Sequence, residues 1–556
     1  MNSTVVAKEK GDANWKQLKI ISNGGKKTGK YKNYLNVLNT GNNETDCVDW
    51  NNVAEWRNVE EEILMSEEMN KEDVLKAKFE EMDKWRSFET YKEVSNQGQK
   101  AISSRWICTK KGDAIKARLV ARGYEDDCSS EKTDSPTIVK ANLRVLFSVA
   151  ASKKWRINFL DVQSAFLQGE ELTREIYLRP PAEAHTDKLW LLRKPVYGLK
   201  IASRKWYNKI CGELLQLGVQ KSKFDPALFY WYNNDVLEGV LGGHVDDFFW
   251  VGTDAFEKQV IEVICSKFKI STTARDNFPF LGLQLKQLVD GSVVVEQYAY
   301  TEDLKLLQIK DAENKERPLN SEEQSALETV IGQLSWIAHQ TRPDISFDVC
   351  QLSAVKRKAT IKHLQYANKI IKKVKNYKIH LKFPSLTKVE SSKIVVYSDA
   401  SFKNLPDCGS QGAHIVFWCD SESRCAPIQW QSKKIKRIVK STLAAECLAL
   451  HDGVDSAFYT KTILQEILKV NIPIHCYVDN NSLVENVHSS TNVKEDQRLV
   501  LDMCALKEMK GRGEIKTINW VSKDKQLADP MTKAGASPLA LQRTLCTGML
   551  KNMLSV

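Results

Sequence analysis

Residues 239–252 read Gly-Val-Leu-Gly-Gly-His-Val-Asp-Asp-Phe-Phe-Trp-Val-Gly, an apolar run that two adjacent acids interrupt. The pattern predicts a β-hairpin with Asp246 and Asp247 at its turn. Two neighbouring carboxylates inside an apolar hairpin are costly to bury unless a cation offsets their charge. An ordinary hairpin turn with solvated acids is the alternative interpretation.

A third acid, Asp161, can join this pair. It follows a short predicted strand, 156–160, and precedes a predicted helix over 162–168. Carboxylates that converge at strand ends form an all-oxygen site, which suits Mg²⁺. Two such ions can activate an attacking hydroxyl and hold a leaving phosphate. The three acids therefore predict a magnesium-dependent phosphoryl-transfer site, with Mn²⁺ as the alternative ion.

Four further acids stand at strand ends or on helices in the last third of the chain: Asp399, Glu446, Asp479 and Asp529. The strands are predicted over 394–397 and 474–478, and Ser441 is a candidate cap for the Ala- and Leu-rich helix that carries Glu446. Acids placed in this way can surround a pair of Mg²⁺ ions about 3.5–4 Å apart. Taken one at a time, each acid is equally well explained as a cap, a turn residue or a surface charge.

Two basic segments lie near these acids. Residues 356–382 hold ten Lys or Arg and no Asp or Glu, and residues 431–440 hold five Lys or Arg. In the first segment apolar residues recur at helical spacing, namely Leu364, Ala367, Ile371 and Val374. This predicts a helix with one apolar and one cationic side. Because like charges one turn apart repel, either a solvated surface or phosphate contacts can explain it.

Composition limits the class of protein. The chain has 556 residues, 42% hydrophobic and 27% charged, as expected of folded domains. Its net charge of +11 favours a polyanionic partner. No apolar stretch is long enough for a membrane span, and the first thirty residues lack a secretory signal. The thirteen scattered cysteines include no Cys-x-x-Cys pair, which favours a reducing compartment over a disulfide scaffold or zinc ribbon.

Ordered motifs surround the first acids: Lys116-Ala-Arg-Leu-Val-Ala-Arg-Gly123, Asp161-Val-Gln-Ser-Ala-Phe-Leu-Gln-Gly169, Ile176-Tyr-Leu-Arg-Pro-Pro181, Val196-Tyr-Gly-Leu-Lys200, Phe224-Asp-Pro-Ala-Leu-Phe229 and His244-Val-Asp-Asp247. In this order they closely resemble the reverse transcriptase of copia-type LTR retrotransposons. The resemblance implies a right-hand polymerase with fingers, palm and thumb, whose metal-binding acids are Asp161, Asp246 and Asp247. It places Lys116 and Arg118 on a fingers hairpin that holds the incoming triphosphate. It also makes residues 280–283 the hairpin that grips the primer end.

The later acids, which close with Ala528-Asp-Pro-Met-Thr-Lys533, resemble the ribonuclease H domain that follows copia-type reverse transcriptases. The resemblance implies that Asp399, Glu446, Asp479 and Asp529 bind two Mg²⁺ ions and that RNA in an RNA–DNA hybrid is hydrolysed. The implied partners are an RNA template, a DNA primer, the hybrid and deoxynucleoside triphosphates, without a membrane. The implied location is a cytoplasmic virus-like particle, with the nucleus as an alternative.

The sequence departs from the family pattern at several positions. His244 stands where relatives have Tyr or Phe, and Ile201 and Ser203 replace Gln and Pro near the nucleotide pocket. Lys494 replaces a His, although Asp496 and Arg498 align, and His488 nearby is interpreted as a surface residue. A truncated or degraded copy that binds nucleic acid without polymerase activity is therefore the alternative function.

The expected architecture combines α+β and α/β domains, a right-hand polymerase followed by a ribonuclease H-like mixed-sheet domain. The predicted divisions are a largely disordered leader (1–54), an acidic helical segment (55–95), fingers and palm (96–300), a helical thumb or connection (301–388), the ribonuclease H-like domain (389–535) and a tail (536–556). No protease motif or zinc module is visible. The chain therefore resembles the C-terminal part of a Pol polyprotein over about residues 55–535.

Overall fold

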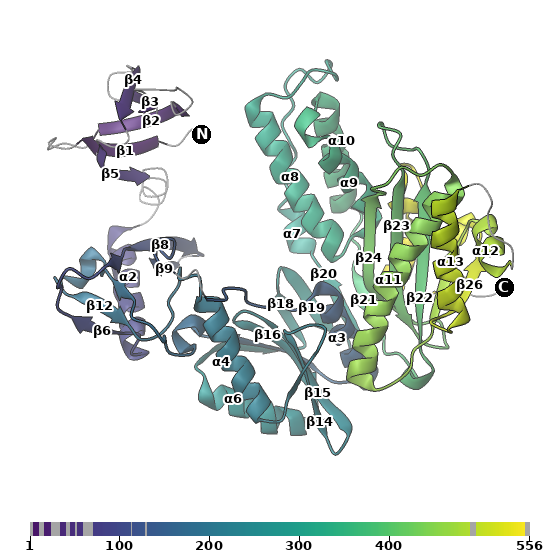
Figure 1. Ribbon diagram of the computed structural model, residues 1–556, viewed down its shortest axis with the longest axis horizontal. Coiled ribbons are helices and arrows are strands. Elements are labelled where there is room, and N and C mark those ends of the chain that lie inside the picture. The colour runs from purple at the N-terminus through teal and green to yellow at the C-terminus, as the bar shows by residue number, and fades with distance from the viewer. Residues whose placement is uncertain are drawn as a thin grey trace. The chain divides into compact units, whose positions relative to one another are not determined.

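The computed structural model describes residues 70–112, 114–127, 131–489 and 496–550, and five strands nearer the N-terminus (Figure 1). The chain divides into two compact units. The first contains residues 1–134 and 166–208, and the second contains 135–165 and 209–556.

The N-terminal strands are β1 Thr4–Glu9, β2 Lys16–Asn23, β3 Tyr34–Asn39, β4 Thr45–Asp49 and β5 Val53–Asn58. They form an antiparallel sheet in the order β4-β3-β2-β1-β5. The structure differs here from the largely disordered leader expected over 1–54. Short β-branched and apolar runs, such as the one in β2, favour strands, whereas the expectation rested on the Asn, Gly and Lys content of the segments between them.

The rest of the first unit contains helix α2 Lys71–Ser87, strands β6 Tyr91–Val94, β7 Ala101–Ile102, β8 Ser104–Lys111, β9 Ala114–Ala121, β11 Tyr177–Leu178 and β12 Leu189–Leu192, and the start of helix α4 Ala202–Gln216. One sheet has the order β6-β12-β11-β7, and β8 and β9 form a hairpin. Asn70 caps α2, accepting a hydrogen bond from the Glu72 N–H at 3.1 Å. Trp85 and Trp190 are fully buried in the core of this unit.

The second unit begins with a sheet in the order β13-β14-β15-β16-β10-β17. Its strands are β10 Ile157–Val162, β13 Gln220–Lys221, β14 Leu228–Asn233, β15 Val236–His244, β16 Asp247–Gly252 and β17 Ile270–Arg275. The predicted hairpin is confirmed as β15–β16. The predicted helix over 162–168 is wrong: Val162 still pairs with Ile270 of β17, and only a 3₁₀ turn, Ala165–Gln168, follows. Sheet pairing on both sides of β10 outweighs local helix preference there.

Helix α3 Lys140–Lys153 covers this sheet and has no cap of its own, because its N-cap residue is Val139. The buried carboxylate of Asp225 replaces that cap. It accepts hydrogen bonds from the Val139 N–H at 2.9 Å and the Asn142 side-chain amide at 2.6 Å. The Phe224–Phe229 motif thus fixes the start of α3. Short helices α5 Asp254–Phe256 and α6 Glu262–Lys267 follow the β16 strand.

A small sheet and a group of helices come next. The sheet has the order β18-β19-β20-β21, with bounds Asn277–Phe280, Leu283–Gln287, Val293–Glu296 and Leu381–Phe383. The helices are α7 Tyr298–Glu302, α8 Ser321–Gln340, α9 Ser346–Val355 and α10 Ile361–Asn376. The capping box of α8 uses Asn320 and Glu323, where the Asn320 amide oxygen accepts a hydrogen bond from the Glu323 N–H at 2.9 Å. The predicted apolar side of α10 is buried.

The C-terminal sheet has the order β24-β23-β22-β25-β26. Its strands are β22 Lys393–Ser401, β23 Gln411–Cys419, β24 Cys425–Lys434, β25 Ile474–Val478 and β26 Ile515–Trp520. The β22 strand pairs antiparallel with β23 and parallel with β25, so the sheet is mixed as predicted. Helix α11 Thr442–Leu468 crosses it (Figure 1), followed by α12 Asn481–His488, α13 Gln497–Gly511 and α14 Leu539–Thr547. Ser441 caps α11 as predicted.

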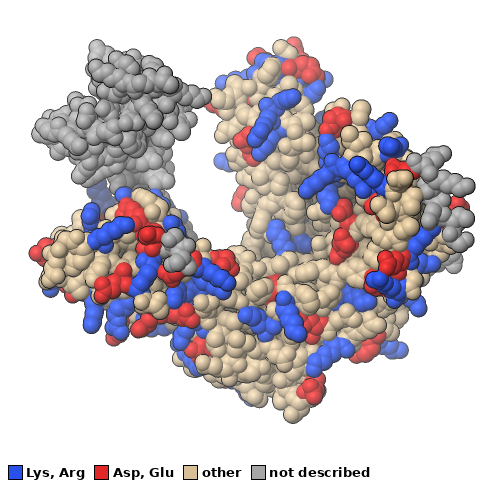
Figure 2. All heavy atoms as spheres, in the orientation of Figure 1, with Lys and Arg blue, Asp and Glu red and all other residues tan. Residues whose placement is uncertain are grey.

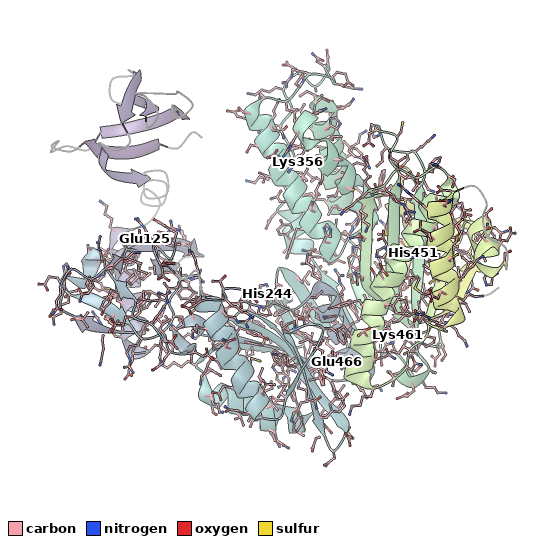
Figure 3. The ribbon with its side chains drawn as sticks, viewed as in Figure 1. Glu125, His244, Lys356, His451, Lys461 and Glu466 are labelled. Atoms are coloured by element: carbon pink, nitrogen blue, oxygen red, sulfur yellow. The ribbon has the colours of Figure 1, made fainter. Side chains whose placement is uncertain are left out.

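One apolar core extends through both large sheets of the second unit. Arg144 of α3 is buried and has no carboxylate partner among the described residues. It stacks on Trp430 of β24 at 3.8 Å and donates a hydrogen bond to the Ile428 carbonyl at 3.1 Å. Glu466 of α11 accepts a hydrogen bond from the Ser222 hydroxyl at 2.5 Å (Figure 3). The predicted boundary at 388/389 lies in the turn between β21 and β22, yet the packing continues across it. Within the described part of the chain, no helix has the length and apolar composition of a bilayer span.

The buried imidazole of His414 in β23 makes acid pH destabilising for the C-terminal sheet. Burial lowers the pKa of His414 to about 4. Because the unfolded chain binds this proton from about pH 6.5 downward, stability is lost as pH falls from 6.5 to 4, by up to about 3 kcal/mol. We expect the urea midpoint to fall over this range, and to fall less in His414→Gln than in the exposed control His488→Gln. Equal slopes in the two variants would contradict this.

Candidate metal centres

The palm acids come together where β10 meets the β15–β16 hairpin. Asp161 lies directly opposite Asp247 in the ladder, and the Val162 N–H donates to the Asp246 carbonyl at 3.0 Å. Val245 turns the hairpin with a φ of +61°. The Ser271 hydroxyl donates a hydrogen bond to the Asp161 carboxylate. Asp161 and the adjacent pair Asp246 and Asp247, which are far apart in sequence, thus occupy neighbouring backbone positions.

Their charges oppose one another. Burial, and then the charges of Asp246 and Asp161, raise the pKa of Asp247 to about 6. A bound cation would relieve this repulsion. His244 is the last residue of β15, opposite Asp247, and forms a bridge with Thr137 (Figure 3). It is therefore half-buried beside the acids, at the position where the resembling family has an aromatic ring.

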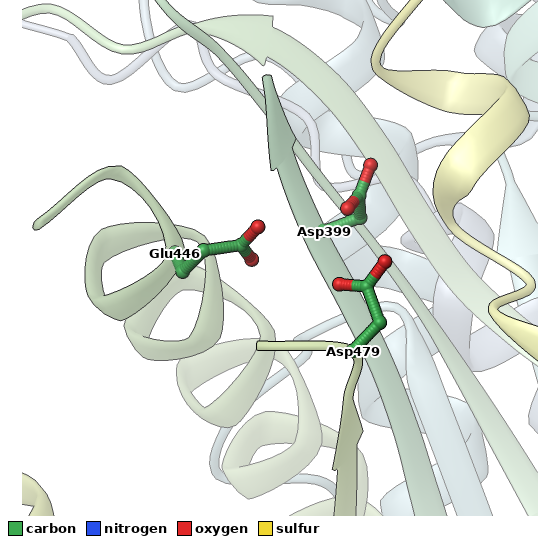
Figure 4. A group of neighbouring side chains, drawn as sticks. All are labelled: Asp399, Glu446 and Asp479. Carbon is green, nitrogen blue, oxygen red and sulfur yellow. The ribbon is translucent and has the colours of Figure 1, made fainter. Parts of the chain in front are cut away.

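The second cluster of acids is tighter. Within the described residues, Asp399, Glu446 and Asp479 are the one group of three potential ligands whose ligand atoms all lie within 4.8 Å of one another. Asp399 comes from β22, Glu446 from α11 and Asp479 from the residue after β25, and their carboxylates point toward one another (Figure 4). Parallel pairing of β22 with β25 brings the two aspartates to the same edge of the sheet.

This cluster fits a hard divalent cation. Burial, and then the charges of Asp399 and Asp479, raise the pKa of Glu446 well above its usual value. Burial, and then Asp399, raise the pKa of Asp479 to about 6. Oxygen Oε2 of Glu446 is buried and has no hydrogen-bond partner in the described residues. Mg²⁺ and Mn²⁺ bind oxygen ligands of this kind. The three carboxylates supply such oxygens, and the one without a hydrogen-bond partner is available to a cation.

Asp529, the fourth predicted acid, lies beside this cluster and contacts a lysine. Its Oδ1 is 2.5 Å from Lys533 Nζ, which is also 3.8 Å from Asp399 Oδ2. The Thr532 hydroxyl donates a hydrogen bond to Asp399. Sequence reasoning quoted Thr532 and Lys533 only as part of a motif. Their spacing, three and four residues after Asp529, is the signal that they face the same side of a helical turn.

Trp520 is a second residue that sequence reasoning missed. It ends β26, and its indole N–H donates a hydrogen bond to the Asp479 carbonyl at 3.1 Å. The residue remains 49% exposed. An exposed aromatic ring is thereby fixed beside the acid cluster. The sequence indicates this role of Trp520 only through its position at the end of the strand that precedes Asp529.

The chain is similar to known reverse transcriptases and Pol polyproteins. A family model described as reverse transcriptase (RNA-dependent DNA polymerase) matches residues 88–321. The Pol polyprotein from transposon RE2 of Arabidopsis thaliana is 28% identical over 460 residues, which are 78% of this chain and 31% of the relative. The Pol polyprotein from transposon TNT 1-94 of Nicotiana tabacum is 25% identical over 509 residues, 85% of this chain and 37% of the relative. The chain is therefore similar to copia-type retrotransposon Pol polyproteins over most of its length and matches the reverse transcriptase family over residues 88–321.

The chain spans about a third of the length of those relatives. Among solved structures, it is similar to a foamy viral protease-reverse transcriptase in complex with double-stranded DNA. The TM-score is 0.49 at 13% identity, covering 80% of this chain and 68% of that chain.

The predicted triphosphate residues share one face of β9. Lys116 and Arg118 are exposed, and Ala117 and Leu119 between and beside them are buried. Arg118 lies 5.7 Å from the ring centre of Tyr197. All of these residues belong to the first unit, whereas the palm acids belong to the second. A planar guanidinium on an exposed strand face can pair with phosphate oxygens.

The departures from the family pattern have different structural settings. Ile201 is 1% exposed and packs in the core of the first unit, so its apolar side chain is accommodated there. Ser203 is the second residue of α4. Asp496 caps α13, His488 is exposed as predicted, and Lys494 lies outside the described residues.

The two basic segments are partly neutralised by acids. In the first, four lysines pair with acids: Lys362 with Glu316, Lys373 with Asp348, Lys378 with Glu302 and Lys382 with Asp290. In the second, the pairs are Lys433 with Asp452, Lys434 with Asp407 and Arg437 with Asp502. Figure 2 shows acidic groups interspersed with the basic ones. The repulsion between the Lys and Arg side chains of each segment is therefore weaker than the segment's own sequence indicates, because acids distant in sequence pair with them.

Proposed function

We propose that this chain is an RNA-directed and DNA-directed DNA polymerase that also hydrolyses the RNA of RNA–DNA hybrids. The observation that carries the proposal is the presence of two separate sets of acids, one at the palm hairpin and one at the edge of the mixed sheet. The family match over residues 88–321 supports the polymerase half. The proposed partners are an RNA template, a DNA primer, the hybrid and deoxynucleoside triphosphates, in an intracellular virus-like particle.

Each set of acids is proposed to hold two Mg²⁺ ions, with Mn²⁺ as a substitute. Bound there, the metal supplies a lowered pKa for the attacking hydroxyl or water and neutralises charge on the leaving group. Asp161, Asp246 and Asp247 bind in the palm, and Ser271 orients Asp161 through its hydroxyl. Asp399, Glu446 and Asp479 bind in the C-terminal sheet, where Thr532 orients Asp399. Asp529 completes this second site with Lys533 as its neighbour.

Arg118 gives a test of the triphosphate site. We expect Arg118→Ala to raise the KM for deoxynucleoside triphosphates about tenfold or more, with a smaller change in kcat, because a charge-assisted hydrogen bond to phosphate is worth about 1.5–3 kcal/mol. The matched control is Arg105→Ala, on the partner strand β8. Steady-state incorporation on a primed RNA template measures both constants. An unchanged KM in Arg118→Ala would remove this residue from the site.

Assays of one purified preparation test the whole proposal. Primer extension on an RNA template and cleavage of a labelled RNA–DNA hybrid are measured with Mg²⁺ and with EDTA. Both activities are expected with Mg²⁺, and neither with EDTA.

A second candidate is a degraded copy that binds nucleic acid without polymerase activity. His244 beside the palm acids favours it, because the aromatic ring of the family pattern is missing there. It predicts salt-dependent hybrid binding and no incorporation by the wild-type chain. Incorporation by that chain would rule it out.

A further inference from the structure

A cavity of about 840 Å³ lies beside the C-terminal acid cluster. Asp529 and Lys533 form its inner wall, and the residues after them, Ala534–Ser537, form another side. Because the Lys533 ammonium lies between Asp529 and Asp399, this one side chain links the cavity to the acid cluster. A ligand in the cavity would therefore be adjacent to the proposed nuclease site.

The rim of the cavity carries unpaired positive charge. Lys523 and Arg543 are both exposed and line the cavity. Neither forms an ion pair with any residue that the structure describes, unlike many cations elsewhere in this domain. Asp524 is the one acid on the rim, since Asp529 is already paired with Lys533. The rim therefore favours an anion.

The loop Ala534–Ser537 adds hydrogen-bond donors. Its side chains are small, and Gly535 has a φ of +79° with open space where a Cβ would stand. The backbone N–H groups of Ala534, Gly535 and Ser537 donate no hydrogen bond to another backbone group in the described part of the chain. Free N–H groups beside two cations can contact phosphate oxygens, which are strong acceptors.

We propose that this cavity binds the phosphodiester backbone of the nucleic acid whose scissile strand enters the acid cluster, with Lys523 and Arg543 as the phosphate contacts. The inference rests on the proposed nuclease function. A continuous backbone suits the site better than a small anion does, because the exposed rim leaves a single phosphate largely solvated. A polyanion also gains affinity by releasing counterions.

The test compares two double variants of the full-length chain. K523Q/R543Q removes two charges at the cavity, and K516Q/R512Q removes two exposed charges elsewhere in the same domain. Binding of a fluorescent RNA–DNA hybrid is measured by anisotropy in EDTA over a range of salt concentrations. We expect K523Q/R543Q to reduce the slope of log affinity against log salt by about 2, which is about 1 for each lost phosphate contact, and the control to leave it unchanged.

Other outcomes separate the proposals. An unchanged slope in K523Q/R543Q would overturn the cavity assignment even if the wild-type chain cleaves the hybrid. A reduced slope would uphold the assignment even if no cleavage occurs, in which case the nuclease proposal fails alone. Binding of inorganic phosphate by the wild-type chain but not by K523Q/R543Q, together with an unchanged salt slope for the hybrid, would overturn the nucleic-acid assignment in favour of a small-anion site. In an active chain, K523Q/R543Q should raise the KM for hybrid cleavage about tenfold and leave kcat within about twofold.

Discussion

Replacing Asp246 by Asn should reduce primer extension on an RNA template by about 10³-fold or more, while cleavage of an RNA–DNA hybrid stays within about twofold of wild type. Asp246 is at the turn that brings Asp247 opposite Asp161. Removing one negative charge there takes away a cation ligand without changing the size of the side chain. The C-terminal cluster has its own acids and is not affected.

A matched control makes this result specific. Asp254 is an exposed acid in α5, which follows the same hairpin. Asp254→Asn should retain extension within about twofold, because it removes the same charge away from the palm acids. Extension that survives in Asp246→Asn would remove the palm assignment.

Replacing Glu446 by Gln should have the reverse effect. Hybrid cleavage should fall by about 10³-fold or more, and primer extension should be retained. Glu446 is 4% exposed and lies against Asp399 and Asp479. Its amide analogue keeps the shape of the side chain but cannot act as a charged ligand. Glu508→Gln, an exposed change on α13, is the control.

The same variant should change stability in a way that depends on metal. Burial and neighbouring acids raise the pKa of Glu446 well above its usual value. Its contribution to stability is therefore present below about pH 4.5 and is lost as pH rises through the folded-state pKa. Since Gln resembles the protonated acid, Glu446→Gln should melt at a higher temperature than wild type at pH 8 in EDTA.

Adding Mg²⁺ or Mn²⁺ should make the wild type melt at a higher temperature than Glu446→Gln. A divalent ion that binds the folded cluster raises the melting temperature of wild type by mass action. The increase should be much smaller in Glu446→Gln. Equal metal-induced shifts in the two proteins would show that the ion binds elsewhere.

Local sequence signals predicted elements whose partners lie close in the chain. The Gly-rich run 239–252 specified its own hairpin, and Asn70 and Ser441 specified helix starts. Local patterns did not predict the conformation of segments whose structure depends on pairing with residues distant in sequence. Val162 was expected to be helical, but pairing with the β17 strand keeps it extended. Acids distant in sequence partly neutralise the basic segments.

The candidate sites show the same limit. The seven acids could be selected from strand ends and ordered motifs, and the structure brings the ligand atoms of Asp399, Glu446 and Asp479 within 4.8 Å of one another. The placement of Lys533 between Asp399 and Asp529 could not be read from the chain, because it depends on how residues 526–533 pack against β22. The exposed ring of Trp520 beside Asp479 likewise follows from the parallel pairing of β25 with β26.

The buried guanidinium of Arg144 affects whether the two halves of the second unit can separate. It has no carboxylate partner, and its burial against Trp430 lowers its pKa to about 9. Pulling the C-terminal sheet away from α3 would expose this stacked pair and break a continuous apolar core. Proteolytic cleavage between β21 and β22 should therefore leave two fragments that remain associated, and the nuclease half expressed on its own should be prone to aggregation.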